Sequence, residues 1–105
     1  MKIGIDFDNV LIKHKGVPGE DNNFEEEPVK GALDAVKWLK KQGHEVYVLT
    51  ARFNTDWVEI ERWLIKWKFP DMEITNKKLN GTAVYIDDRA IRFTNWQDVC
   101  RYLGK

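Results

Sequence analysis

The sequence predicts an α/β fold with a mostly parallel, doubly wound sheet and helices on both of its faces, in three layers. The main observation is that apolar, β-prone runs alternate with stretches in which apolar residues recur every three or four positions. Strands that alternate with helices in this way favour parallel pairing. The chain has 105 residues, so we expect a single domain that spans residues 1–105.

The first expected strand is the apolar run that ends at Asp6, and a polar loop follows it between Leu11 and Phe24. A helix is expected from Pro28, which suits a first helical position, to about Gly43, which suits a C-terminal cap. The apolar residues between them follow helical spacing: Val29, Ala32, Leu33, Val36 and Leu39.

The remaining chain predicts four more strands and two more helices. A second helix is expected from about Thr55 until Pro70 stops it, and a third over residues 96–103. The uninterrupted runs at 46–50 and 82–86 are typical of strands buried on both faces. The expected strands are residues 46–50, residues 72–75, residues 82–86 and, at an edge, residues 91–93.

Composition excludes several classes of protein. The 17 basic and 17 acidic residues give a net charge of zero, so no charge surplus favours nucleic acid or an anionic membrane. The sequence shows no signal-peptide pattern, and no apolar stretch approaches the length of a membrane span, so we expect a soluble, cytoplasmic protein. The single cysteine, Cys100, is expected to be a buried, inert thiol.

The five tryptophans do not form a nucleic-acid pattern, because no basic residues interleave with them. Trp57 and Trp67 follow helical spacing and are expected in the core. Trp38 and Trp63 lie nearer the edges of the apolar stripes. They are therefore expected to be exposed rings or contacts of a homodimer.

Polar residues follow the ends of the predicted strands. Ligands of parallel α/β sheets bind beyond the carboxyl ends of the strands, so these residues should gather at one edge. Two carboxylate pairs gathered there repel each other unless a cation lies between them, and all-oxygen ligands favour Mg²⁺. His14 and His44 stand alone and are interpreted as loop or strand-entry residues. The residues expected at the edge are Asp6, Asp8, Thr50, Lys77, Lys78, Asp87 and Asp88.

These side chains suit the chemistry of a phosphoryl group. A lysine and a threonine can supply positive charge and hydrogen-bond donors to phosphate oxygens. One carboxylate can attack phosphorus, while a second protonates the leaving oxygen and later takes a proton from water. The residues alone do not say which of Asp6 and Asp8 attacks.

Four motifs in this order resemble those of the haloacid dehalogenase superfamily. Residues 5–10, Ile-Asp-Phe-Asp-Asn-Val, resemble its first motif, Asp-x-Asp-x-Thr/Val after a hydrophobic strand. Residues 49–52, Leu-Thr-Ala-Arg, are similar to the second motif, and Lys78 falls at the place of the third-motif lysine. Residues 85–88, Tyr-Ile-Asp-Asp, resemble the fourth motif in its double-aspartate form. The resemblance covers nearly the whole chain and implies a Rossmann-like, HAD-like fold.

The resemblance also implies how the acids divide the work. Asp6 would be the nucleophile that forms an aspartyl-phosphate, and Asp8 the general acid and base. Mg²⁺ would be held by the Asp6 carboxylate, the main-chain carbonyl of Asp8 and the fourth-motif acids, with Asp88 as a direct ligand and Asp87 acting through water. An acid at the position of Asp8 is typical of the superfamily's phosphatases.

The substrate phosphate would be bound by residues of the second and third motifs: Thr50, Ala51, Arg52 and Lys78. For Arg52 a second interpretation stays open, namely pairing with a neighbouring acid. The third motif also leaves a choice, because Lys77 precedes Lys78 and Leu79 stands where proline is frequent. Asn9 replaces a frequent glycine, which a turn tolerates. No stretch is long enough for a cap domain, so we expect a minimal, capless member with an open site.

The leading prediction is therefore a Mg²⁺-dependent phosphatase that hydrolyses a phosphomonoester, either a small molecule or the end of a polymer. Two alternatives stay open. A receiver-like phosphoacceptor module also carries acids, Thr/Ser and Lys at strand ends, but its phosphorylated Asp ends a middle strand, where this chain has Thr50. A Mg²⁺-dependent nuclease needs only the clustered acids.

Overall fold

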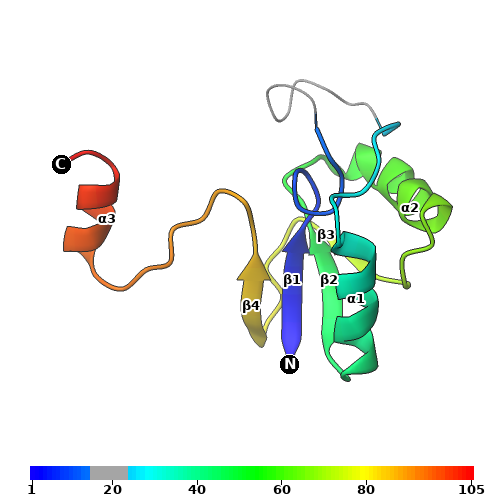
Figure 1. The fold of residues 1–105 in the computed structure, drawn as a ribbon, viewed down its shortest axis with the longest axis horizontal. Helices are drawn as coiled ribbons and strands as arrows, with labels where there is room; N and C mark the ends of the chain where they lie inside the picture. The colour runs from blue at the N-terminus through cyan, green and yellow to red at the C-terminus, as the bar shows by residue number, and fades with distance from the viewer. Residues whose placement is uncertain (15–23) are drawn as a thin grey trace.

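A computed structural model describes residues 1–14 and 24–105; residues 15–23, most of the polar loop expected between Leu11 and Phe24, lie outside the described residues. The described chain forms a four-stranded sheet in the order β3-β2-β1-β4, with every pair parallel (Figure 1). This confirms the α/β class and the parallel sheet. The strands are β1 (Lys2–Asp6), β2 (Glu45–Leu49), β3 (Glu73–Thr75) and β4 (Thr82–Ile86).

Three helices accompany the sheet: α1 (Ala32–Lys41), α2 (Trp57–Lys66) and α3 (Trp96–Tyr102), with a 3-10 turn, η1 (Asn54–Asp56), before α2. Helix α1 starts later than the expected Pro28, because Gly31 has a φ of 85° that does not belong to a helix. Gly43 has a φ of 89° just beyond the C-cap Gln42, as expected of a C-terminal glycine. None of these helices is long and apolar enough to cross a bilayer.

The hydrophobic core lies between the sheet and the helices α1 and α2. Alternate residues of neighbouring strands face it, since Ile3 pairs with Val46 and Ile5 with Val48, and these side chains pack with those of both helices. The buried helical residues are Val36, Ile60, Trp63 and Leu64. Trp57 and Trp67 are partly buried and pack against this core.

The expectation that Trp63 is an exposed ring or a contact of a homodimer is wrong. Its side chain is fully buried, its ring stands edge-on to Phe7 at 5.3 Å between centroids, and its indole N–H donates to the Glu26 carbonyl at 2.8 Å. The ring thus fills the space beneath the end of β1 and ties the segment before α1 to α2. Trp38, by contrast, is exposed as expected.

The opposite face of the sheet is built around Gly4, whose register neighbours are Tyr47 and Tyr85. A Cβ atom at position 4 would lie 2.8 Å from the Tyr47 hydroxyl oxygen, so only glycine leaves room for that ring. The Tyr47 hydroxyl bonds to the Thr82 hydroxyl at 2.8 Å and accepts from the Leu79 N–H at 3.3 Å. These bonds fasten the start of β4 to the centre of the sheet.

The C-terminal part departs from the sequence-based expectations. Strand β4 forms but is not buried, residues 91–93 form no strand, and Cys100 is half-buried rather than buried. Residues 87–95 lead away from the sheet and leave α3 apart from the other described elements (Figure 1). The expected third layer therefore does not form within the described part of one chain, because residues 87–95 place α3 away from the sheet.

Candidate active site

The ends of two neighbouring strands bring three carboxylates together. Strands β1 and β4 are adjacent, with Ile5 opposite Ile86, so the residues that follow, Asp6 and Asp87, leave the sheet side by side. One carboxylate oxygen from each of Asp6, Asp87 and Asp88 lies within 4.8 Å of the others. We call these three residues the acidic cluster. Its Asp6 is half-buried, while Asp87 and Asp88 are exposed.

The acidic cluster holds Asp6 in an unusual electrostatic state. Burial, the negative charge of Asp87 and a hydrogen bond with Asp88 raise the pKa of Asp6 from its ordinary 3.8 to about 7, and the Phe7 N–H, which donates to Asp6 Oδ1 at 2.8 Å, opposes that rise only in part. Three carboxylates at this spacing are the donor set of a hard divalent cation. Among the described residues, these three acids are therefore the group that could hold a metal ion.

Asp8 lies in a different environment only two residues further on. It lies in a tight loop, residues 7–12, in which the Leu11 and Ile12 N–H groups both donate to the Phe7 carbonyl. Asn9 has a φ of 64° in this loop, a left-handed conformation that asparagine adopts more readily than most residues. The loop turns the Asp8 side chain away from the acidic cluster and toward the segment that follows β2.

Two cationic or donor side chains hold the Asp8 carboxylate. The Arg52 guanidinium donates through Nη2 to Oδ1 at 2.8 Å and through Nε to Oδ2 at 3.1 Å, and a ring nitrogen of the buried His14, Nε2, bonds to Oδ1. Although burial works against ionisation, the bonds from Arg52 and His14 lower the pKa of Asp8 below its ordinary value. We call Asp8, Arg52 and His14 the Asp8 network.

Arg52 is itself fixed by its surroundings. Its backbone N–H donates to the Thr50 hydroxyl at 3.1 Å, and its guanidinium lies 4.7 Å from the ring centroid of Phe24 and 5.9 Å from that of Phe7. The Asp56 carboxylate is a second acidic neighbour of Arg52, with Oδ2 at 3.9 Å from Nη1. Of the two interpretations of Arg52, pairing with a neighbouring acid is the one that the structure shows.

The remaining predicted residues occupy the same edge of the sheet. Thr50 follows β2, is buried, and donates its N–H to the Thr75 carbonyl at 2.9 Å, while Ala51 is exposed beside it. The Lys78 ammonium lies 5.1 Å from the ring centroid of Tyr85, and within the described residues it forms no ion pair with the acidic cluster. Lys77 is exposed and donates its backbone N–H to the Thr75 hydroxyl.

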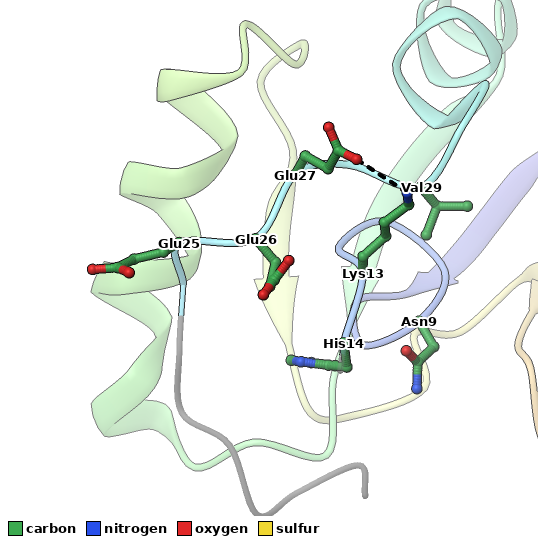
Figure 2. Close-up of a pocket in the computed structure, with 7 residues that line it drawn as sticks. All are labelled: Asn9, Lys13, His14, Glu25, Glu26, Glu27 and Val29. Atoms are coloured by element: carbon green, nitrogen blue, oxygen red, sulfur yellow. Dashed lines mark hydrogen bonds and ion pairs between the residues drawn. The ribbon is translucent and has the colours of Figure 1, made fainter. Parts of the chain in front are cut away.

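The loop after Asp8 also borders a pocket beside the Asp8 network (Figure 2). Its wall carries both signs of charge, and the Lys13 ammonium pairs with the Glu27 carboxylate at 3.0 Å. His14 belongs to this wall as well as to the Asp8 network, so the pocket opens next to the site. The residues that line it are Asn9, Lys13, His14, Glu25, Glu26, Glu27 and Val29.

Comparisons of this chain with protein-family models, with curated proteins and with solved structures give no significant match.

His14 is the site residue that sequence reasoning missed. The interpretation as a loop residue was right about its element but not about its contact, because His14 reaches back to Asp8 across the turn of residues 7–12. The available signal was that a histidine follows Asp8 by six positions, on the far side of a segment with asparagine at its turn. Spacing of that kind does not specify a contact unless the path of the loop is known.

Proposed function

We propose that this chain is a Mg²⁺-dependent phosphomonoester hydrolase of the haloacid dehalogenase type, acting through an aspartyl-phosphate on Asp6. The observation that carries the proposal is the pairing of two carboxylates with opposite electrostatic environments at one strand end. Asp6 belongs to an acidic cluster that suits a cation, whereas Asp8 is held in a separate network of donors. A two-step phosphoryl transfer needs two carboxylates with different tasks.

The donor set of the acidic cluster fits Mg²⁺. Its members offer only oxygen atoms, and the raised pKa of Asp6 expresses the cost of holding three carboxylates together without a compensating charge. Bound Mg²⁺ would keep Asp6 ionised at neutral pH and would neutralise charge on the phosphate. Asp6 and Asp88 are the proposed direct ligands with the Asp8 carbonyl, and Asp87, whose Oδ1 accepts from the Arg89 N–H at 2.7 Å, is the proposed outer ligand.

In the proposed first step, an Asp6 carboxylate oxygen bonds to phosphorus while the bond from phosphorus to the ester oxygen breaks. The departing oxygen takes a proton that Asp8 would acquire from solvent when the negatively charged phosphate binds beside it, and Asp8 is left as the carboxylate that Arg52 and His14 stabilise. In the second step, Asp8 takes a proton from water as the water oxygen bonds to phosphorus, and the Asp6 carboxylate is released with inorganic phosphate. This second step returns to Asp8 the proton that it gave in the first, and the bond from His14 holds the Asp8 carboxylate in place between the two steps.

Thr50 and Lys78 are the proposed donors to the phosphate oxygens. Thr50 directly follows β2 and lies next to Asp6, since Leu49 pairs with Asp6 in the sheet. Lys78 is exposed and carries its charge over Tyr85 on β4, whose chain continues into the acidic cluster. We propose that Lys78 turns from this ring to an anionic substrate, with Ala51 lining the entrance. The sequence has no stretch long enough for an inserted cap domain, which suits a bulky phosphate ester or a polymer end as the substrate.

The decisive experiment measures release of inorganic phosphate from an aryl phosphate by the full chain, with Mg²⁺ and with a chelator. We expect Mg²⁺-dependent turnover that falls by at least about 10³-fold in Asp6→Asn, because an amide is a poor nucleophile and a weaker metal ligand. Asp34→Asn on the exposed side of α1 is the matched control and should leave activity unchanged. Full activity of Asp6→Asn would refute the assigned nucleophile. Absence of turnover on sugar phosphates, nucleotides, polynucleotide ends and phosphoproteins would refute the phosphatase.

A further inference from the structure

The last quarter of the chain carries most of the exposed large apolar side chains among the described residues. Among the described residues, eight of the thirteen exposed large apolar side chains lie between positions 84 and 103. Three of them lie on β4, and the others belong to the segment of residues 87–105, which we call the C-terminal arm. These side chains are Val84, Tyr85, Ile86, Ile91, Phe93, Trp96, Tyr102 and Leu103.

The amount of exposed surface corresponds to an interface. A compact monomer of 12.4 kDa exposes about 6,100 Å², whereas this chain exposes 7603 Å². The radius of gyration of 14.8 Å likewise exceeds the value of about 13 Å for a compact chain of this length. If two copies each buried the excess of about 1,500 Å², the interface would total about 3,000 Å², which is the size of permanent dimer interfaces.

The C-terminal arm carries a helical face built for packing. Trp96, Val99, Cys100 and Leu103 follow the spacing of one helical stripe, and Trp96 and Leu103 are both 71% exposed. Helix α3 has seven residues, too few to remain helical in water without a partner, even with the cap that Asn95 provides by accepting from the Asp98 N–H. Its helical state therefore calls for a surface on which the stripe can be buried.

The exposed strand β4 offers a surface of matching character. It is an edge strand of the sheet, and Val84, Tyr85 and Ile86 present apolar side chains on both of its faces. The C-terminal arm of the same chain leads away from β4 rather than back over it (Figure 1). One chain thus carries both a receiving surface and a segment that fits it, separated by an extended connection.

We infer that two copies of this chain form a dimer by exchanging their C-terminal arms, so that α3 of each copy packs on β4 of the other. The exchange is reciprocal, so a two-fold axis closes it, and neither the C-terminal arm nor β4 of either copy stays free to bind a third copy in the same way. It supplies from the partner copy the third layer that the single chain lacks. Asp87 and Asp88 stand at the base of the arm, so the dimer interface begins beside the acidic cluster.

The test is the molar mass of the full chain in solution, measured by sedimentation equilibrium over a range of concentrations, with no need for catalysis. We expect a species of twice 12.4 kDa that dissociates on dilution. Trp96→Glu should raise the dissociation constant by at least about 30-fold, because it places a charge in the centre of the interface. Ile65→Glu is the matched control, an exposed apolar residue of α2, and should change the constant less than about twofold.

Hydrogen exchange of the α3 amides distinguishes a helix that packs on the partner copy from a helix that packs on its own chain. We expect protection of residues 96–102 above the dissociation constant and its loss below. Protection at both concentrations would show that α3 packs on its own chain and would overturn the proposal. A monomer at every concentration, or a dimer that Trp96→Glu leaves intact, would overturn it as well. Circular dichroism of the variant checks that the sheet and α1 persist.

Discussion

Asp6 and Asp8 differ by two positions on the same strand end, and the structure places them in opposite electrostatic environments. Asp6 faces two other carboxylates and has a pKa raised to about 7, while Asp8 faces a guanidinium and an imidazole and has a lowered pKa. The difference arises from the loop of residues 7–12, which turns Asp8 toward the end of β2 while Asp6 stays in line with β4.

The Asp-x-Asp sequence motif is therefore only half of the site. Two aspartates at a strand end acquire distinct properties from the strands on either side: β4 supplies negative charge through Asp87 and Asp88, and the segment after β2 supplies positive charge through Arg52. The acidic cluster therefore gains from a cation, whereas the Asp8 network is already balanced. Changes in the two regions should affect different measurements.

The largest expected effect separates catalysis from metal binding. Asp8→Asn should lower kcat by about 10² to 10⁴-fold, because the amide cannot exchange a proton with the leaving oxygen or with water. Stabilisation of the fold by Mg²⁺ should persist, since the Asp8 carbonyl and the acidic cluster are unchanged. Asp88→Asn should instead weaken that stabilisation. The measurements are steady-state kinetics and the Mg²⁺-induced rise in Tm. Loss of that rise in Asp8→Asn would contradict the assignment of metal binding to the acidic cluster and of proton transfer to the Asp8 carboxylate.

The next effect is on the stability of the Asp8 network. Arg52→Ala should lower the free energy of unfolding by about 2 kcal/mol, because it leaves a half-buried carboxylate without its main donor and removes a cation from the rings of Phe7 and Phe24. Arg62→Ala is the matched control. Its ion pair with Glu59 is exposed, so the cost should stay below about 0.5 kcal/mol. Urea unfolding of both variants without Mg²⁺ measures the difference, and equal costs would argue against a structural role of Arg52.

A third effect follows from the raised pKa of Asp6. An acid that binds its proton more tightly in the folded than in the unfolded state contributes stability at low pH, and this contribution is lost as the pH rises from about 3.8 to about 7. Asp6→Asn should remove that slope in the presence of a chelator. Mg²⁺ competes with the proton, so its effect on Tm should be larger at pH 8 than at pH 5. An equal rise at both pH values would mean that Asp6 does not take part in binding the ion.

The sequence predicted the sheet well because its signals are local. The β-prone runs at 46–50 and 82–86 and the helical stripe that includes Val36 lie within single elements, so periodicity suffices to find them. Burial depends on what lies opposite, and three predictions of it were wrong, those for Trp63, β4 and Cys100. Trp63 stands at the edge of its stripe yet fills the core beside Phe7, and β4 has a buried-strand sequence but no cover in its own chain.

The candidate site shows the same limit. Convergence of Asp6, Asp87 and Asp88 follows from strand order alone, because β1 and β4 are neighbours in a parallel sheet. The contacts of Arg52 and His14 with Asp8 depend on the path of two loops, which no spacing in the sequence encodes. Strand topology was therefore enough to predict the acidic cluster, whereas the contacts of the Asp8 network are visible only in the three-dimensional structure.

The smallest effect concerns His14, whose Nδ1 is buried without a hydrogen-bond partner among the described residues. Burying this unpaired nitrogen costs free energy, which offsets part of what the bond from His14 to Asp8 contributes to stability. His14→Leu should therefore leave the free energy of unfolding nearly unchanged while lowering kcat about fivefold, since Asp8 keeps its Arg52 donors but loses the ring nitrogen. His14→Gln restores a donor and should recover most of the activity. A His14→Leu enzyme with full kcat would limit the Asp8 network to Asp8 and Arg52.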